Sequence, residues 1–175
     1  QPGDRRQGRE PRQGDVTMAN PESVFIIAEA GVNHNGSLDR AKEMVKAAAQ
    51  AGADAVKFQT FKAEQLVTRS AVKAEYQKKR SDAGETQLDM LKKFELTFDD
   101  HLELAETCRR NNIEFLSAPF DMDAVDLLIK IGVRRWKIPS GEITNLPYLR
   151  KIAASRKKII LSTGMAELEE IKSAL

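Results

Sequence analysis

The sequence predicts an α/β fold, a TIM (β/α)8 barrel of which this chain covers about five strand–helix units. Five short apolar runs each end at a polar residue and lead into a segment with helical spacing, and no Gly-x-Gly-x-x-Gly turn follows any of them. The runs are Val24–Ala28, Ala53–Val56, Ile113–Leu116, Val133–Trp136 and Ile159–Leu161, closed by Glu29, Lys57, Ser117, Lys137 and Ser162. Polar groups at every strand end favour a closed barrel over an open doubly wound sheet.

The first half of the chain opens with VFIIAEAG as a strand. Ser37 can cap the helix that follows, in which apolar residues recur at helical spacing until Gly52 ends it. ADAVKFQTF predicts the second strand. Residues 62–96 then form an insertion too long for an ordinary strand–helix loop, which is equally well a surface excursion or a lid over the strand ends.

The second half is more regular. Thr97 and Asp100 stand at capping-box spacing before a helix that runs to Asn111. IEFLSAPF predicts the third strand, Asp121 can cap the next helix, and Gly132 ends it. VRRWKIPSGE begins the fourth strand, Asn145 can cap LPYLRKIAAS, and KKIILSTGM carries the fifth strand into AELEEIKSAL. Such alternation predicts a parallel sheet with right-handed crossovers.

Composition and charge narrow the class of protein. The 28 basic and 26 acidic residues give a net charge of +2 and are interleaved, so no basic stripe for nucleic acid is expected. No apolar run approaches the length of a membrane span, so no membrane partner is expected. Cys108 is the single cysteine, which excludes an internal disulfide and favours a cytoplasmic location. We expect Cys108 itself to be a packing residue.

The first 20 residues differ from the rest of the chain. They hold four Arg, two Pro and three Gly with few apolar residues, and they lack the hydrophobic core of a signal peptide. We expect residues 1–20 to be a disordered or non-native extension, with the functional chain starting near Met18. Residues 21–175 then form the N-terminal part of the barrel domain.

Chemistry is expected where the parallel strands end, because these ends converge on one rim of a barrel. The candidate residues combine two ammonium groups, two carboxylates and several hydroxyls, which suits an anionic substrate and proton transfer; they are Glu29, Lys57, Gln59, Ser117, Lys137, Ser140, Glu142 and Ser162. Buried lysines here need a counter-charge, supplied by a phosphate or carboxylate ligand or by a glutamate.

Two Ser-Gly segments predict close approach of backbone N–H groups to ligand oxygens. They are Ser140-Gly141 and Ser162-Thr163-Gly164. Glu29 and Glu142 can divide roles, one orienting water or a sugar hydroxyl and the other moving a proton.

The two histidines do not predict a metal site. His34 lies in a Gly-flanked turn after the first strand and is either a donor facing the site or a satisfied turn residue. His101 lies among acidic residues in the first turn of a helix and reads as a surface group. Without a second histidine at a strand end, these residues do not make a complete transition-metal site.

Several segments together resemble the N-terminal part of the bacterial N-acetylneuraminate (sialic acid) synthase family. They are AEAGVNHNGS, AGADAVKFQTFKAEQL, KAEYQ, FLSAPFD, WKIPSGEITNLPYLRKIA and KKIILSTGMAELEEIKSAL. The resemblance implies a TIM-barrel transferase that condenses phosphoenolpyruvate with N-acetylmannosamine, releasing phosphate. It also implies a divalent metal, Mn or Mg, and a homodimer. The metal ligands and a small antifreeze-like domain are expected beyond Leu175, so residues 1–175 should be inactive alone.

The resemblance also implies roles for individual residues. Glu29 resembles the family's sugar-side carboxylate, and Lys57 resembles a phosphoenolpyruvate-binding lysine. Lys137, Ser140 and Ser162 resemble the groups that hold its phosphate and carboxylate. Glu142 is the expected proton-transfer partner, and Gln59, Ser117 and Phe120 are expected to contact substrate. Ala118 departs from a threonine that some members carry, so no hydroxyl contact is expected there.

Three alternatives remain open on the sequence. Synthases for legionaminic acid, pseudaminic acid or spore-coat sugars share these segments. Lys57 or Lys137 could instead be the Schiff-base lysine of an aldolase. Finally, the chain could be a barrel fragment without catalytic function.

Overall fold

The computed structural model describes residues 24–68 and 86–175, so the extension expected at 1–20 lies outside the described residues. The strands are β1 (Ile27–Gly31), β2 (Ala55–Thr60), β3 (Glu114–Pro119), β4 (Arg135–Ile138) and β5 (Lys158–Leu161). The helices are α1 (Leu38–Gln50), α2 (Ala63–Leu66), α4 (Gln87–Lys92), α5 (Phe98–Arg110), α6 (Met122–Ile131), a 3-10 turn η1 (Ser140–Glu142), α7 (Leu146–Ala153) and α8 (Leu168–Ala174).

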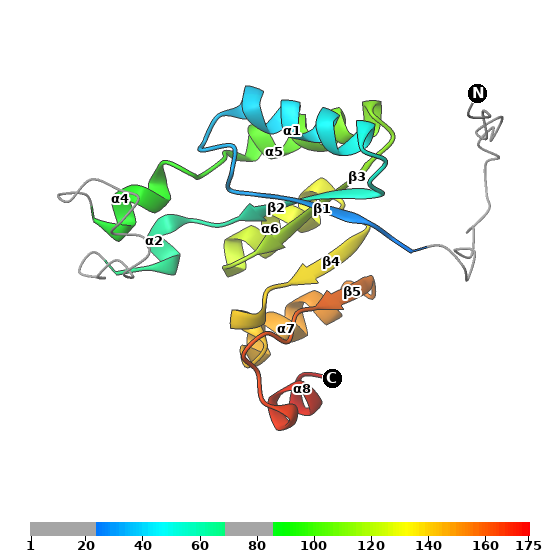
Figure 1. Cartoon of the computed structure of the whole chain (residues 1–175). Helices are drawn as coiled ribbons and strands as arrows, with labels where there is room; N and C mark the ends of the chain where they lie inside the picture. The colour runs from blue at the N-terminus through cyan, green and yellow to red at the C-terminus, as the bar shows by residue number, and fades with distance from the viewer. Residues whose placement is uncertain (1–23, 69–85) are drawn as a thin grey trace.

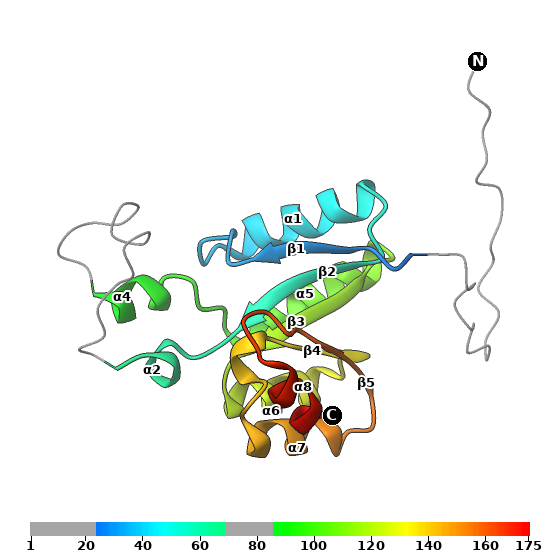
Figure 2. The same ribbon diagram turned by 60° about the horizontal axis from the view of Figure 1, so that its bottom comes forward.

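The strands are parallel and follow chain order. β1, β2 and β3 form one sheet, β4 and β5 form a second, and β3 contacts β4 (Figure 1). Helices α1 and α5 lie side by side, with α1 against β1 and β2 and α5 against β3 (Figure 2). The predicted α/β fold with parallel strands is therefore confirmed. Closure into an eightfold barrel stays a prediction.

The predicted helix boundaries are confirmed where local chemistry sets them. The side chains of Ser37, Thr97, Asp121 and Asn145 each accept a hydrogen bond from the backbone N–H three residues later, as N-cap residues do. Thr97 forms a complete capping box. Gly132 ends α6 in the left-handed region, at φ +82°.

The strand ends differ from the prediction. The strands continue past the apolar runs that predicted them. Four of the five polar residues expected just after the strands therefore lie within them: Glu29, Lys57, Ser117 and Lys137. Only Ser162 directly follows its strand. Successive side chains of a strand point to opposite faces of the sheet, so a polar residue can occupy one face without ending the strand.

The core fills the space between the strands and the helices. Val56, Phe58 and Trp136 are almost fully buried there, and the Trp136 indole N–H donates to Ser155 Oγ at 2.7 Å. Cys108 on α5 is also buried, which confirms its packing role and raises the pKa of its thiol to about 12. Among the described helices, none combines the length and the apolar character needed to cross a bilayer.

Candidate active site

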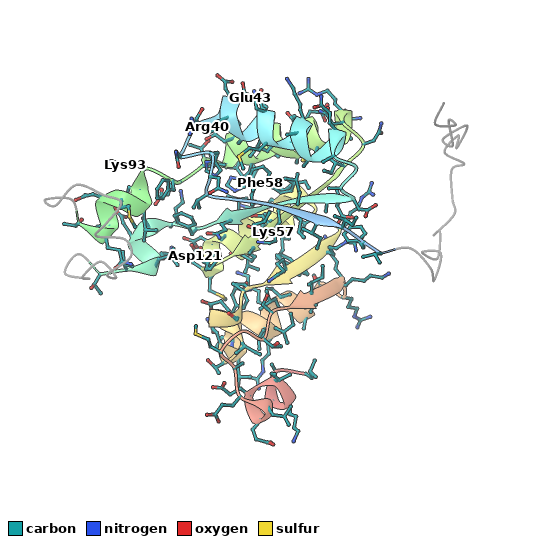
Figure 3. The ribbon with its side chains drawn as sticks, viewed as in Figure 1. Arg40, Glu43, Lys57, Phe58, Lys93 and Asp121 are labelled. Carbon is teal, nitrogen blue, oxygen red and sulfur yellow. The ribbon has the colours of Figure 1, made fainter. Side chains whose placement is uncertain are left out.

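Glu29 and Lys57 meet on the face of the sheet opposite the packed helices. They are register partners on β1 and β2, and Lys57 Nζ forms an ion pair with Glu29 Oε2. The Lys57 side chain is 13% exposed, whereas that of Glu29 is 53% exposed. Figure 3 shows Lys57 and its neighbour Phe58 on opposite faces of β2. The ammonium group is therefore sheltered, and its carboxylate partner is open to solvent.

Gln59 lies two residues after Lys57 on β2 and therefore on the same face of the sheet. A Cβ at Gly31 would lie 3.1 Å from Glu29 Oε1 and 3.8 Å from Gln59 Nε2. Gly31 has φ +54°, a conformation that glycine adopts most readily. The missing side chain leaves room beside the carboxylate and the amide.

Lys137 brings a second ammonium group from β4. Its Nζ donates to Ile138 O at 3.0 Å and also bonds Ser162 Oγ. Burial, and then repulsion from Lys57, lowers the pKa of Lys137, while attraction to Glu29 opposes that shift. Lys137 is therefore close enough to Lys57 and Glu29 for their charges to act on it.

Ser140, Ser162 and Gly164 come together at the ends of β4 and β5. Ser162 N donates to Ile138 O at 3.0 Å, which joins the two strand ends. A Cβ at Gly164 would lie 3.6 Å from Ser140 Oγ, so the two Ser-Gly segments are adjacent. Hydroxyls, a glycine backbone and the Lys137 ammonium group thus face one small region that suits an anion.

Glu142 lies two residues after Ser140, and Phe120 lies at the end of the neighbouring strand β3. Glu142, in η1, accepts from Asn145 Nδ2 at 2.8 Å. Burial raises the pKa of Tyr148, and the charge of Glu142 adds to that shift. Phe120 directly follows β3, is partly exposed, and donates its N–H to Thr60 O at 3.0 Å.

Ser117 is not placed with the other candidates. It is the register partner of Phe58 and therefore lies on the helix-covered face, where it is 1% exposed. Its hydroxyl lies 2.7 Å from Thr60 Oγ1, which in turn lies 2.9 Å from His101 Nε2. The alternation of β3 turns Ser117 away from Lys57.

The sequence-based view of His101 as a surface group is wrong. His101 is 1% exposed, and its Nδ1 lies 2.7 Å from Thr97 O, so that nitrogen carries the proton and Nε2 accepts from Thr60. The signal was present in α5, because His101, Leu104 and Cys108 recur at helical spacing on its buried stripe. The acidic residues Asp99 and Asp100 beside His101 had instead suggested an exposed helix turn.

His34 is also buried and does not lie among the lysines. It is fully buried against Phe58, with ring centroids 6.1 Å apart, and its Nδ1 accepts from Gly36 N at 3.0 Å. Its Nε2 has no hydrogen-bond partner within the described part of the chain. The prediction of a satisfied turn residue therefore holds for Nδ1, which bonds within the turn, but not for Nε2.

We expect the two buried histidines to make stability depend on pH. Burial is the main cause that lowers the pKa of both below the unfolded value of about 6.5. As pH falls through 6.5, the unfolded chain binds protons that the folded chain resists, so the free energy of unfolding decreases. Each histidine can contribute a slope of at most about 1.4 kcal/mol per pH unit.

Urea unfolding between pH 7.5 and 5.5 measures this effect. The wild-type midpoint is expected to fall with pH, and the midpoint of His101→Gln is expected to fall less. An equal slope in both proteins would contradict the assignment for His101.

No group of three His, Cys, Asp or Glu side chains able to hold a metal occurs within residues 24–68 and 86–175.

The chain is similar to known sugar acid synthases. It is 52% identical over 168 residues to N,N'-diacetyllegionaminic acid synthase of Legionella pneumophila, covering 96% of this chain and 46% of that protein. It is 36% identical over 148 residues to human N-acetylneuraminate-9-phosphate synthase, covering 85% of this chain and 41% of that one. The chain thus spans about half the length of these relatives or less.

A solved structure gives the same picture. The sialic acid synthetase of Leptospira borgpetersenii, crystallised with citrate, superposes with a TM-score of 0.72 at 37% identity, over 86% of this chain and 48% of that chain. The NeuB family model matches residues 44–175. These residues include β2 to α8 and every candidate side chain except Glu29. The chain belongs to the NeuB family and represents a partial, N-terminal region of it.

Proposed function

We propose that this chain supplies the phosphoenolpyruvate-binding part of a sugar acid synthase built on a TIM barrel. The observation that carries the proposal is the bond between Lys137 and Ser162, beside the adjoining Ser140 segment, with the Lys57 charge near enough to act on Lys137. Phosphoenolpyruvate carries a phosphate and a carboxylate, and two ammonium groups with nearby hydroxyl and amide donors match those charges.

In the proposed reaction, C3 of phosphoenolpyruvate forms a bond to the aldehyde carbon of an open-chain sugar. Water adds at C2, and cleavage of the C–O bond releases phosphate. The lysines and serines hold the anion and stabilise the charge that develops on it. We assign to Glu29, which is exposed and beside Gln59, the orientation of a sugar hydroxyl or water, and to Glu142 the proton transfer. The expected divalent metal would polarise the sugar oxygen; no step assigned to the described residues depends on it.

We propose N,N'-diacetyllegionaminic acid as the product, in preference to N-acetylneuraminate. The 52% identity to a synthase of that name, against 36% to a human N-acetylneuraminate-9-phosphate synthase, supports this alternative. A nine-carbon product less the three carbons of phosphoenolpyruvate leaves a six-carbon sugar with two acetamido groups. The homodimer, the metal and the cytoplasmic location remain predictions.

Calorimetric titration of the 175-residue chain with phosphoenolpyruvate tests the binding part. We expect saturable binding with a Kd below about 1 mM, equivalent to about −4 kcal/mol. Phosphate and pyruvate should each bind more weakly, because each offers only one of the two anionic groups. Absence of saturable binding would reject the proposed anion site in this chain.

The full-length protein tests the product. Phosphate release with phosphoenolpyruvate should be faster with the diacetamido sugar than with N-acetylmannosamine. Faster phosphate release with N-acetylmannosamine would instead identify N-acetylneuraminate as the product.

One observation favours a second candidate, a Schiff-base aldolase. The lowered pKa of Lys137 increases the fraction of neutral amine available as a nucleophile. Borohydride trapping with pyruvate would label Lys137 in that case. Phosphoenolpyruvate-dependent phosphate release without such labelling would reject it.

A further inference from the structure

Asp121 joins two of the strand-end loops through both of its carboxylate oxygens. It follows Phe120 and is only 8% exposed. Its Oδ1 accepts from Ala124 N at 2.6 Å, which caps α6, and its Oδ2 accepts from Lys62 N at 2.7 Å. The sequence predicts the first of these bonds. The second crosses from the segment after β3 to the segment after β2; Figure 3 labels Asp121 there.

The bond to Lys62 continues the pairing of β2 and β3 beyond the strands. The register ends with Thr60 opposite Pro119, and Phe120 N donates to Thr60 O at 3.0 Å just after it. The Asp121 carboxylate then reaches Lys62 N, two residues farther along. The chain after Gln59 and the chain around Phe120 are therefore tied at consecutive points.

A second bond supports the same loop from the other side. Tyr148 on α7 is fully buried, and its hydroxyl donates to Pro119 O at 2.8 Å. Burial, with the nearby charges of Glu142 and Asp121, raises the pKa of Tyr148, so its hydroxyl stays protonated and remains a donor. Residues 119–121 are thus held by β2 and by α7 at once.

We propose that Asp121 is a positioning residue for the anion site: by holding Lys62 N it fixes Phe120 relative to the end of β2, the strand that carries Lys57 and Gln59. This inference rests on the proposed function, because it concerns phosphoenolpyruvate. Asp121 itself has both oxygens occupied by backbone N–H groups and is not assigned a contact with substrate. Its effect on binding passes through the two loops.

Asp121→Asn separates positioning from folding. Asparagine is as good an N-cap as aspartate, so it can still accept from Ala124 N, but its NH2 group cannot accept from Lys62 N. Asp123→Asn is the matched control, because Asp123 lies in the same segment and accepts from Gln65 Nε2 at 2.5 Å in an exposed position. Both substitutions remove one negative charge.

Two measurements on the 175-residue chain test the proposal. Asp121→Asn should raise the Kd for phosphoenolpyruvate about tenfold, and Asp123→Asn should change it by less than about twofold. Amide hydrogen exchange at Lys62 should be faster in Asp121→Asn and unchanged in Asp123→Asn. Unchanged affinity in Asp121→Asn, with faster exchange, would overturn the positioning role.

Kinetics of the full-length protein distinguish positioning from general destabilisation. Asp121→Asn should raise KM for phosphoenolpyruvate more than it lowers kcat, whereas a smaller folded fraction would lower kcat alone and contradict the proposal. If wild-type chain does not bind phosphoenolpyruvate, the proposed function and the binding role of Asp121 fail together. The exchange data still show in that case whether Asp121 ties the two loops.

Discussion

Lys137→Met should weaken phosphoenolpyruvate binding by about ten- to a hundredfold. Hydrogen bonds that involve a charged group contribute about 1.5–3 kcal/mol, and methionine keeps the length of lysine without its charge. Lys137 is also partly buried, so its interaction with an anion is less screened by solvent than that of a surface lysine. Calorimetric titration measures the loss.

Lys57→Met should cause a loss at least as large, for an additional reason. Lys57 is the ion-pair partner of Glu29, and without it the Glu29 carboxylate would repel an anionic ligand. Lys46→Met is the control, because Lys46 is exposed on α1 and its removal changes net charge by the same amount. Equal affinities for the control and the two site variants would contradict the assignment.

Gly36→Ala is expected to destabilise the fold by more than about 2 kcal/mol. Gly36 has φ +75°, which costs an L-residue about 1–2 kcal/mol. A Cβ at this position would also lie 2.1 Å from Lys93 O. Because that atom belongs to the backbone, the clash requires the turn after β1 to move away from the segment after α4.

Gly52→Ala is the matched control for that prediction. Gly52 has φ +81°, but a Cβ there would meet no atom within 4 Å. It should therefore lose only the conformational part, about 1–2 kcal/mol. Urea unfolding of both variants measures the difference, and equal losses would show that the contact with Lys93 does not constrain the turn.

The local sequence determined much of the fold. Capping side chains act on backbone groups three residues away, so Ser37, Thr97, Asp121 and Asn145 could be identified without knowledge of tertiary contacts. Gly132 likewise marks the end of α6 through its own φ angle. The order of strands and helices followed from these signals and from the spacing of apolar residues.

The candidate site was predicted less completely. The lysines Lys57 and Lys137 were recognisable as polar residues near strand ends, but their position on one face depends on strand register. Ser117 shows why: it follows the same sequence pattern, yet the pairing of β2 with β3 places it on the opposite face, bonded to Thr60. A shift of one residue reverses the face of every side chain in a strand.

By itself the sequence determined the parallel α/β fold, the caps and the resemblance to a sugar acid synthase family, because these depend on near neighbours and on ordered motifs. Only the tertiary structure decided which polar residues share a face, that His101 is buried, and that Asp121 reaches Lys62. Those facts depend on contacts between residues far apart in the chain, 41 positions for His101 with Thr60 and 59 for Asp121 with Lys62, which local patterns do not encode.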